Sequence, residues 1–329
     1  MKIVALALIL VASSSALAAP ASQPATLDAA ALAALRAIQH EPETSKLIFN
    51  QHYVVSNELR QYLFRRATTA APPRGGLFVG VGAEQNYILA AWYRSDVIVV
   101  LDFDPWIADL HAIYALLFRR ARTPQEFLRL WSARREVEAA IEAETPAGPV
   151  RQQRVRVFRH AREKVWQRLR DIAKEYPKGA ATFLTDQAQY DHLASLARGG
   201  RMHALQADFC GERSLKQLAA WARRHRVPLR VLYLSNVEWY FPYTQGRYRQ
   251  NILDFTFGEP SLVLQTSPIA KDRYAYVFQA GATYRDWLSC QCVPALKSLL
   301  RHGRWINEHV VEVSKRPADV PGLPRAKTP

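Results

Sequence analysis

Gly75-Gly-Leu-Phe-Val-Gly-Val-Gly-Ala-Glu-Gln-Asn86 is the stretch that decides the expected fold. An apolar run reaches Gly80-Val-Gly82 and then gives way to a helical pattern. A second apolar run, Val97-Ile-Val-Val-Leu101, follows and stops at Asp102. A strand, a glycine turn, a helix and a second strand that ends in an acid commonly hold a nucleotide-type ligand, because the glycines let the backbone approach the ligand and the acid accepts hydrogen bonds from a ribose. The stretch therefore predicts an α/β fold with a small-molecule ligand after the first strand.

The rest of the sequence alternates between strand-like and helical segments. Apolar runs at residues 202–206, 229–234, 261–265 and 274–278 predict further strands. The alternation predicts a Rossmann-like, mostly parallel sheet with helices on both faces. Residues 105–180 form a helical insertion after the second strand, and Asp104-Pro105 is a favourable start for its first helix.

The chain divides into four expected parts. Residues 1–18 are a signal peptide, and residues 19–74 are a helical N-terminal segment with a linker that ends near Pro72-Pro73. Residues 75–314 form the α/β domain, and the Pro-rich tail at 315–329 is expected to be disordered.

The N-terminus has the pattern of a secretory signal peptide. Met1-Lys2 is a short positive start, residues 3–11 are apolar, and Ala16-Leu-Ala18 is a small-x-small cleavage site. Cleavage after Ala18 is favoured, because cleavage one residue later would leave Pro20 in the first position of the mature chain. The alternative is an uncleaved anchor, but the apolar run is shorter than the ~20 residues that span a bilayer. We therefore expect export to the periplasm or beyond, with no transmembrane segment in the mature chain.

A formal net charge of +15, carried mostly by Arg, favours anionic partners such as acidic polymers or charged surfaces. Charge on exposed helix faces explains the same composition equally well. No basic run is interleaved with aromatic residues as a nucleic-acid stacking platform requires, so nucleic-acid binding is not expected.

Three cysteines do not form a disulfide framework. Cys290-Gln-Cys292 are too close in sequence for an unstrained bridge, so we expect Cys210 to pair with one of them and to leave one free thiol. A metal site built from these residues and nearby histidines has no recognisable ligand spacing, and no metal is expected.

Four strand ends carry a resemblance to the class I fold of S-adenosylmethionine-dependent methyltransferases. The matching features are Gly80-x-Gly82, Asp102-Phe-Asp104-Pro105, Asp208 and Asn236, each at the end of an expected strand. More narrowly, Val79-Gly-Val-Gly-Ala-Glu-Gln-Asn86 and Tyr233-Leu-Ser-Asn-Val-Glu238 resemble a family of uncharacterised bacterial proteins with that fold. The resemblance spans roughly residues 75–280.

The resemblance implies how S-adenosylmethionine would be held. Gly80 and Gly82 would let the backbone approach its methionine part. Asp102 would bind the ribose hydroxyls, and Asp208 would face the adenine amino group. Glu84 stands where a third glycine is usual, and its carboxylate would either pair with the cofactor's ammonium group or fill the site.

The resemblance also implies residues on the side of the methyl acceptor. Methyl transfer is an in-line displacement, so the protein must align the acceptor with the sulfonium and receive a proton. Asn236 would orient an acceptor N–H or O–H, and Glu238 would act as the base.

Two departures from the methyltransferase pattern leave a second hypothesis open. Phe78 replaces the acid that usually precedes the first glycine, and Glu84 replaces the third glycine. The glycines could simply form a tight turn, and Asp102 and Asp208 could cap helices. Asp102-x-Asp104 also resembles the metal-binding pair of nucleotide-sugar transferases, although capping explains Asp104 better. The chain is therefore either a methyltransferase or a non-catalytic exported protein whose crevice holds another small ligand or an anionic partner.

Overall fold

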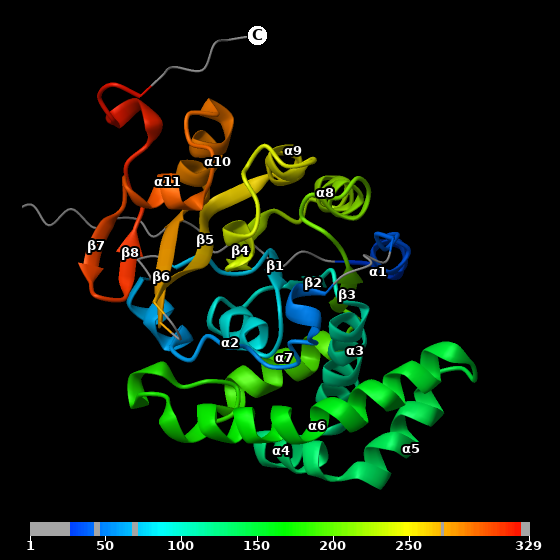
Figure 1. The fold of residues 1–329 in the computed structure, drawn as a ribbon. Coiled ribbons are helices and arrows are strands. Elements are labelled where there is room, and N and C mark those ends of the chain that lie inside the picture. The colour runs from blue at the N-terminus through cyan, green and yellow to red at the C-terminus, as the bar shows by residue number, and fades with distance from the viewer. Residues whose placement is uncertain (1–26, 43–46, 68–71, 271–272, 324–329) are drawn as a thin grey trace, which may run out of the picture.

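An eight-stranded sheet runs through the middle of the computed structural model, which describes residues 27–42, 47–67, 72–270 and 273–323 (Figure 1). The strands lie in the order β3-β2-β1-β4-β5-β6-β8-β7. They are β1 (Leu77–Val81), β2 (Val97–Asp102), β3 (Met202–Gln206), β4 (Leu229–Ser235), β5 (Phe257–Ala270), β6 (Arg273–Ala280), β7 (Arg304–Asn307) and β8 (Val310–Glu312). The predicted signal peptide and the last six residues of the predicted tail lie outside the described residues.

The sheet is mixed, so the prediction of a mostly parallel Rossmann-like sheet is wrong. Strands β3, β2, β1, β4 and β5 are parallel to one another, but β6 runs antiparallel to β5, and β7 runs antiparallel to β8. β8 in turn pairs in parallel with β6. Only residues 271–272 separate β5 from β6. A parallel pair needs a crossover of a dozen or more residues, so this short connection allows only a hairpin.

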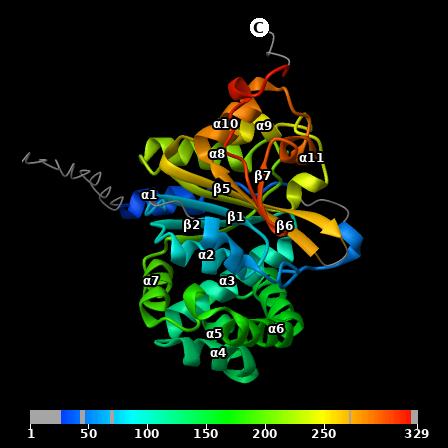
Figure 2. The same ribbon diagram turned by 90° about the vertical axis from the view of Figure 1, so that its left-hand side faces the viewer.

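Helices cover both faces of the sheet, as predicted (Figure 2). One face carries α2 (Gln85–Trp92), α3 (Pro105–Arg120), α4 (Pro124–Ser132), α5 (Arg134–Glu144), α6 (Pro149–Glu175) and α7 (Gln187–Arg198). The other carries α1 (Ala29–Arg36), α8 (Ser214–Arg224), α9 (Tyr248–Leu253), α10 (Gly281–Cys290) and α11 (Leu296–Leu300). Among the described residues, no helix combines the length and the apolar character needed to cross a membrane.

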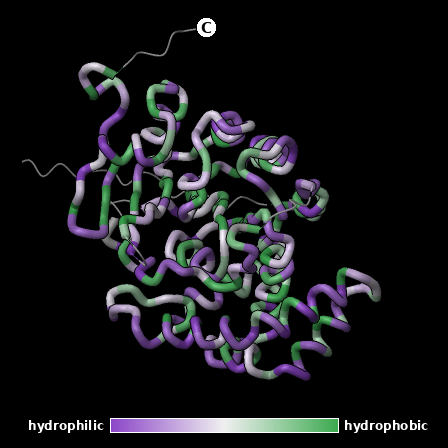
Figure 3. Tube along the Cα trace, in the orientation of Figure 1, coloured by the Kyte–Doolittle hydropathy of each residue, from purple (hydrophilic) through white to green (hydrophobic). Residues whose placement is uncertain are grey.

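The strands separate two hydrophobic cores because successive side chains point to opposite faces. Phe78 and Ile98 belong to the core under α2 and α3, whereas Val79 and Val99 belong to the core under α8 and α10. All four side chains are fully buried. Figure 3 shows the corresponding contrast between the hydrophobic central strands and the many hydrophilic residues along α6.

The N-terminal segment crosses the carboxyl ends of the central strands before it enters β1. A 3₁₀ turn at Ile48–Asn50 and a 3₁₀ helix at Gln61–Ala67 flank an irregular stretch. We call residues 51–58 the strap. Phe64 anchors its far end, because its fully buried ring packs 5.2 Å from the ring of Tyr276 on β6.

The disulfide also differs from the prediction. Cys290 and Cys292 form the bridge, and Cys210 is a half-buried free thiol. Gln291 between the paired cysteines adopts the left-handed conformation at φ +53°, which ends α10 and turns the chain back on itself. This turn brings the two Cα atoms to 5.2 Å, within the usual range for a disulfide. The sequence spacing alone did not reveal the turn.

Candidate functional site

A crevice lies at the carboxyl ends of β1, β2 and β4. Its walls come from the loops that follow these strands, residues 81–85, 102–107 and 235–240, and from the strap. The crevice has a volume of about 110 Å³. The chain order of the strands reverses at β1, because β2 lies on one side of it and β4 on the other. Ligands of open α/β sheets commonly bind at such a switch point.

The glycine turn after β1 is held by side chains of the protein itself. Gly82 has φ +86°, which a residue with a Cβ rarely adopts, and an added Cβ at Gly80 would collide with the side chain of Asn86. The Asn86 amide in turn donates to the carbonyls of Val81 (3.0 Å) and Ala83 (2.9 Å). Both glycines are therefore required by the turn, and of the two only Gly82 also lines the crevice.

His111 on α3 fixes the carbonyl of Gly82. Its Nε2 lies 2.7 Å from that carbonyl oxygen, and its Nδ1 lies 2.8 Å from the hydroxyl of Tyr87. Burial lowers the pKa of His111 to about 4, so the ring is neutral near pH 7. The neutral ring then donates from Nε2 to Gly82 and accepts at Nδ1 from Tyr87.

Asp102 is the carboxyl that lines the crevice at the end of β2. Its Oδ1 accepts the backbone N–H of Asp104 at 3.0 Å. Burial raises the pKa of Asp102 to about 7, the negative charge of Asp104 adds to the rise, and backbone N–H donors oppose it. A carboxyl that titrates near neutral pH in a crevice is a candidate functional group.

Asp104 caps α3, as the sequence predicts. Its carboxylate accepts the backbone N–H of Trp106 at 2.9 Å. The same carboxylate lies 2.8 Å from Nδ1 of His52 on the strap, and the His52 ring stacks on the Trp106 ring at 3.9 Å. One end of the strap is thus fastened to the start of α3.

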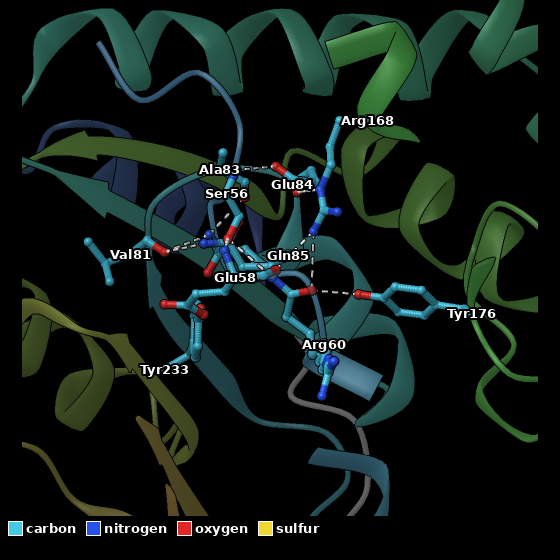
Figure 4. A network of polar contacts seen from close by, with 12 residues as sticks. Ser56, Glu58, Arg60, Val81, Ala83, Glu84, Gln85, Arg168, Tyr176 and Tyr233 are labelled. Carbon is cyan, nitrogen blue, oxygen red and sulfur yellow. Dashed lines mark hydrogen bonds and ion pairs between the residues drawn. The ribbon is translucent and has the colours of Figure 1, made fainter. Parts of the chain in front are cut away.

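Glu84 lies beneath the turn and outside the crevice lining. Its fully buried carboxylate pairs with Nε of Arg168 on α6 at 2.8 Å and accepts the backbone N–H of Ser56 at 3.0 Å (Figure 4). Arg168 also donates to the carbonyl of Glu58 at 2.9 Å. The Glu84 carboxylate is therefore engaged by the protein itself and fills the space under the turn, so it is not free to pair with the ammonium group of a cofactor.

Glu58 is a buried acid that the sequence did not reveal. Its carboxylate accepts hydrogen bonds from the hydroxyls of Tyr233 (2.5 Å), Ser235 and Thr266 (2.6 Å). Burial raises its pKa, and these three donors oppose the rise. Glu58 therefore ties the strap to the ends of β4 and β5, next to the pair formed by Glu84 and Arg168 (Figure 4).

The family model described as Domain of unknown function (DUF7790) matches residues 53–315. The chain belongs to this family. The match spans all three strand-end loops of the crevice and most of the strap. No curated protein matches the chain.

In this DUF7790 member, the structure brings three of the predicted site residues together. Gly82, Asp102 and Asn236 line the crevice, from the loops after β1, β2 and β4. Gly80 and Glu84 lie behind the turn, as described above. The N-terminal segment is expected from the sequence to pack on the sheet as a lid or flank, but no local pattern indicates that the strap lines the crevice.

Asp208 and Glu238 lie outside the crevice lining. Asp208 accepts the backbone N–H of Cys210 at 2.8 Å, which stabilises the loop after β3. Glu238 is buried, and its carboxylate accepts hydrogen bonds from the hydroxyls of Tyr248 (2.6 Å) and Tyr284 (2.5 Å) and from the amide of Gln265. Burial raises the pKa of Glu238, and its hydrogen-bond donors oppose the rise.

The polar groups of the crevice have a distinct charge pattern. Asp102 and Asp104 supply carboxyl groups, and neither Lys nor Arg is among the lining residues in the described part of the chain. The rest of the polar lining consists of amide and hydroxyl groups, contributed by Gln51, Asn57, Gln85 and Asn236 and by Tyr53, Ser56, Ser235 and Tyr240. Within the described ranges, no group of three His, Cys, Asp or Glu residues is placed to hold a metal ion.

Proposed function

We propose that this chain binds a small, neutral or cationic molecule with hydroxyl groups in the crevice. The observation that carries the proposal is the position of the crevice, at the carboxyl ends of parallel strands where their order reverses. Gly82, Asp102 and Asn236 are the residues that would contact the ligand.

Charge restricts the class of ligand. Two carboxyl groups, with neither Lys nor Arg among the described lining residues, disfavour phosphates and carboxylates, and they favour a cation or a hydroxyl donor. An ionised Asp102 accepts hydrogen bonds from vicinal hydroxyls, such as those of a ribose. S-Adenosylmethionine carries both a ribose and a sulfonium cation, so it is the first ligand to test.

The size of the crevice limits the ligand that it can enclose without rearrangement. The crevice volume of about 110 Å³ is below the ~300–1,000 Å³ of pockets that enclose a drug-sized ligand. A complete S-adenosylmethionine would require the strap to move away. Glu84 is paired with Arg168, so it would not serve as the partner of the cofactor's ammonium group.

Methyl transfer is the second candidate, and the position of Asn236 in the crevice favours it. In this candidate Asn236 orients the acceptor. Asp102, whose pKa is about 7, is better suited to receive the proton than Glu238, whose carboxylate is held by two tyrosines.

Titration calorimetry of the mature chain with S-adenosylmethionine, S-adenosylhomocysteine and adenosine tests the proposal. We expect heat of binding that is lost in Asp102→Asn and kept in Asp191→Asn, a matched change on the exposed side of α7. Absence of heat at millimolar concentration of all three ligands would refute binding of a nucleoside-type ligand. If the ligand binds but no methyl group is transferred to candidate acceptors, the binding function is supported and methyl transfer to those acceptors is excluded.

We also propose that the protein acts after export, on the basis of the signal-peptide pattern at residues 1–18. Cell fractionation combined with N-terminal sequencing tests this. The expected result is a chain that begins at Ala19 outside the cytoplasm, and full-length protein in the cytosol would contradict it.

A further inference from the structure

A second depression lies along the free edge of the sheet and is larger than the crevice. It has a volume of about 650 Å³ and is lined by β3, α3, the start of α6 and the segment from Arg36 to His40. We call it the β3 groove. β3 is the terminal strand of the sheet on this side, so among the described residues no other strand covers one of its edges.

The backbone of β3 directs hydrogen-bonding groups into the groove. The carbonyl of Arg201 and the N–H of Ala207 bond to β2, and these residues alternate with those that face away from the sheet. Gln206 is one of the outward residues, because its carbonyl accepts the N–H of Glu41 at 2.9 Å. By the same alternation, Met202 and Ala204 present their N–H and C=O groups outward, and both residues line the groove.

The contact at Gln206 shows that another segment of chain can hydrogen-bond to this edge. Its N–H also donates to Nδ1 of His40 at 2.9 Å, so residues 40 and 41 engage both backbone groups of Gln206. Met202 and Ala204, which precede Gln206 on β3, also line the groove.

The wall opposite β3 leaves room for another strand. It is formed by α3, which presents Ala108, Ala112 and Ala115 at helical spacing toward the groove. Larger side chains at these positions would close the space beside β3.

The groove carries a positive charge. Its lining contains three Arg residues, Arg36, Arg119 and Arg154, against one acid, Asp109. Arg154 pairs with Asp109, and Arg119 pairs with Glu144, whereas Arg36, the last residue of α1, is exposed. The charge of the groove is opposite in sign to that of the crevice. The groove is therefore a location for the anionic partner that the net charge suggests.

We propose that the β3 groove binds an extended, acidic segment of another protein, which adds to β3 as a further strand. The backbone groups of Met202 and Ala204 would pair with the added strand, and Arg36 would contact its acidic side chains. Strand addition to a free sheet edge is a common way to recognise an extended peptide.

Fluorescence anisotropy with a labelled peptide of alternating Glu and Val tests the proposal on the mature chain. A peptide of alternating Lys and Val is the charge control, and a Glu-Val peptide with prolines at alternate positions cannot complete the backbone pairing. We expect the Glu-Val peptide to bind at least about tenfold more tightly than either control. Hydrogen exchange should then slow at the amides of Met202 and Ala204.

Two variants with matched controls separate charge from shape. Arg36→Glu should weaken binding of the Glu-Val peptide, whereas Arg135→Glu on exposed α5 should not. Ala112→Leu should fill the groove and abolish binding, whereas Ala139→Leu on exposed α5 should not. Circular dichroism verifies that each variant is folded. If Ala112→Leu does not fold, Arg36→Glu still tests the proposal.

Four outcomes would overturn the proposal, and the first three concern the peptides. They are equal affinity for the Glu-Val and Lys-Val peptides, binding that survives both groove variants, and absence of binding at millimolar peptide. A dimer in sedimentation that Ala112→Leu dissociates would also overturn it, because a second copy of the chain would then occupy the groove.

Discussion

Replacement of Arg168 by Met should strongly destabilise the fold, because it leaves Glu84 as an uncompensated charge in the interior. The Glu84 side chain is fully buried and that of Arg168 is 10% exposed, with 2.8 Å between Nε and Oε1. Removal of one partner of such a pair typically costs about 3–5 kcal/mol. The loss of the Arg168 hydrogen bond to the Glu58 carbonyl adds to this cost, so we expect a value near the upper end.

Equilibrium unfolding in urea, followed by circular dichroism, measures this cost. The double variant Arg168→Met with Glu84→Gln should be more stable than Arg168→Met alone, because it removes the orphaned charge. Arg129→Met is the matched control, since Arg129 forms an exposed pair with Glu136 and its loss should leave the unfolding midpoint unchanged. If Arg168→Met resembled this control, the pair would be solvated, and it would not hold the strap and α6 together.

Three further predictions concern the turn and the two buried acids beside it. Gly80→Ala should lower the unfolding midpoint in urea, because its Cβ would collide with the side chain of Asn86; unchanged stability would mean that the turn relaxes freely. Glu58→Ala should cost at least about 2 kcal/mol in the same assay, because buried hydroxyls lose their acceptor. Because burial raises the pKa of Glu58, its contribution to stability falls as pH rises above 4.5, and Glu58→Gln should flatten this dependence. Binding of a cationic ligand should strengthen as pH rises through about 7, where Asp102 ionises; calorimetry at several pH values measures this, and an affinity that does not change with pH would contradict it.

The central strands and the glycine turn could be predicted because their signals are local. Apolar runs that end in Gly80-Val-Gly82 and Asp102 specify two strands, a turn and an intervening helix within about thirty residues. The antiparallel direction of β6 could not be predicted from such local signals. An apolar run specifies a strand but not its orientation. The connection at 271–272 requires a hairpin only once the ends of both strands are known.

The polar network around the strap could not be predicted for a related reason. Glu58 and Arg168 are separated by 110 residues, and each lies in a segment whose charges look solvated in the sequence. Only packing of α6 and the strap against the sheet buries them together. A single sequence carries no signal for such a contact, whereas Asp102 and Asn236 follow strands and could be placed by topology.

The separation of charge between the crevice and the β3 groove bears on both proposals. α3 contributes to both sites: its N-terminal end, with Asp104, borders the crevice, and Ala108 and Ala112 line the groove. The crevice presents carboxyl groups, whereas the groove presents arginines, so one ligand would not satisfy both sites.

Asp104 also fastens the strap through His52, so a ligand that displaces the strap would break a contact with α3. Any coupling between the two sites would therefore pass through the start of α3. His52→Phe removes the contact with Asp104 but keeps a ring to stack on Trp106, so it should weaken the coupling between the sites. Peptide affinity measured with and without the crevice ligand, in both the native chain and His52→Phe, gives the coupling directly, and equal ratios in the two chains would exclude this route.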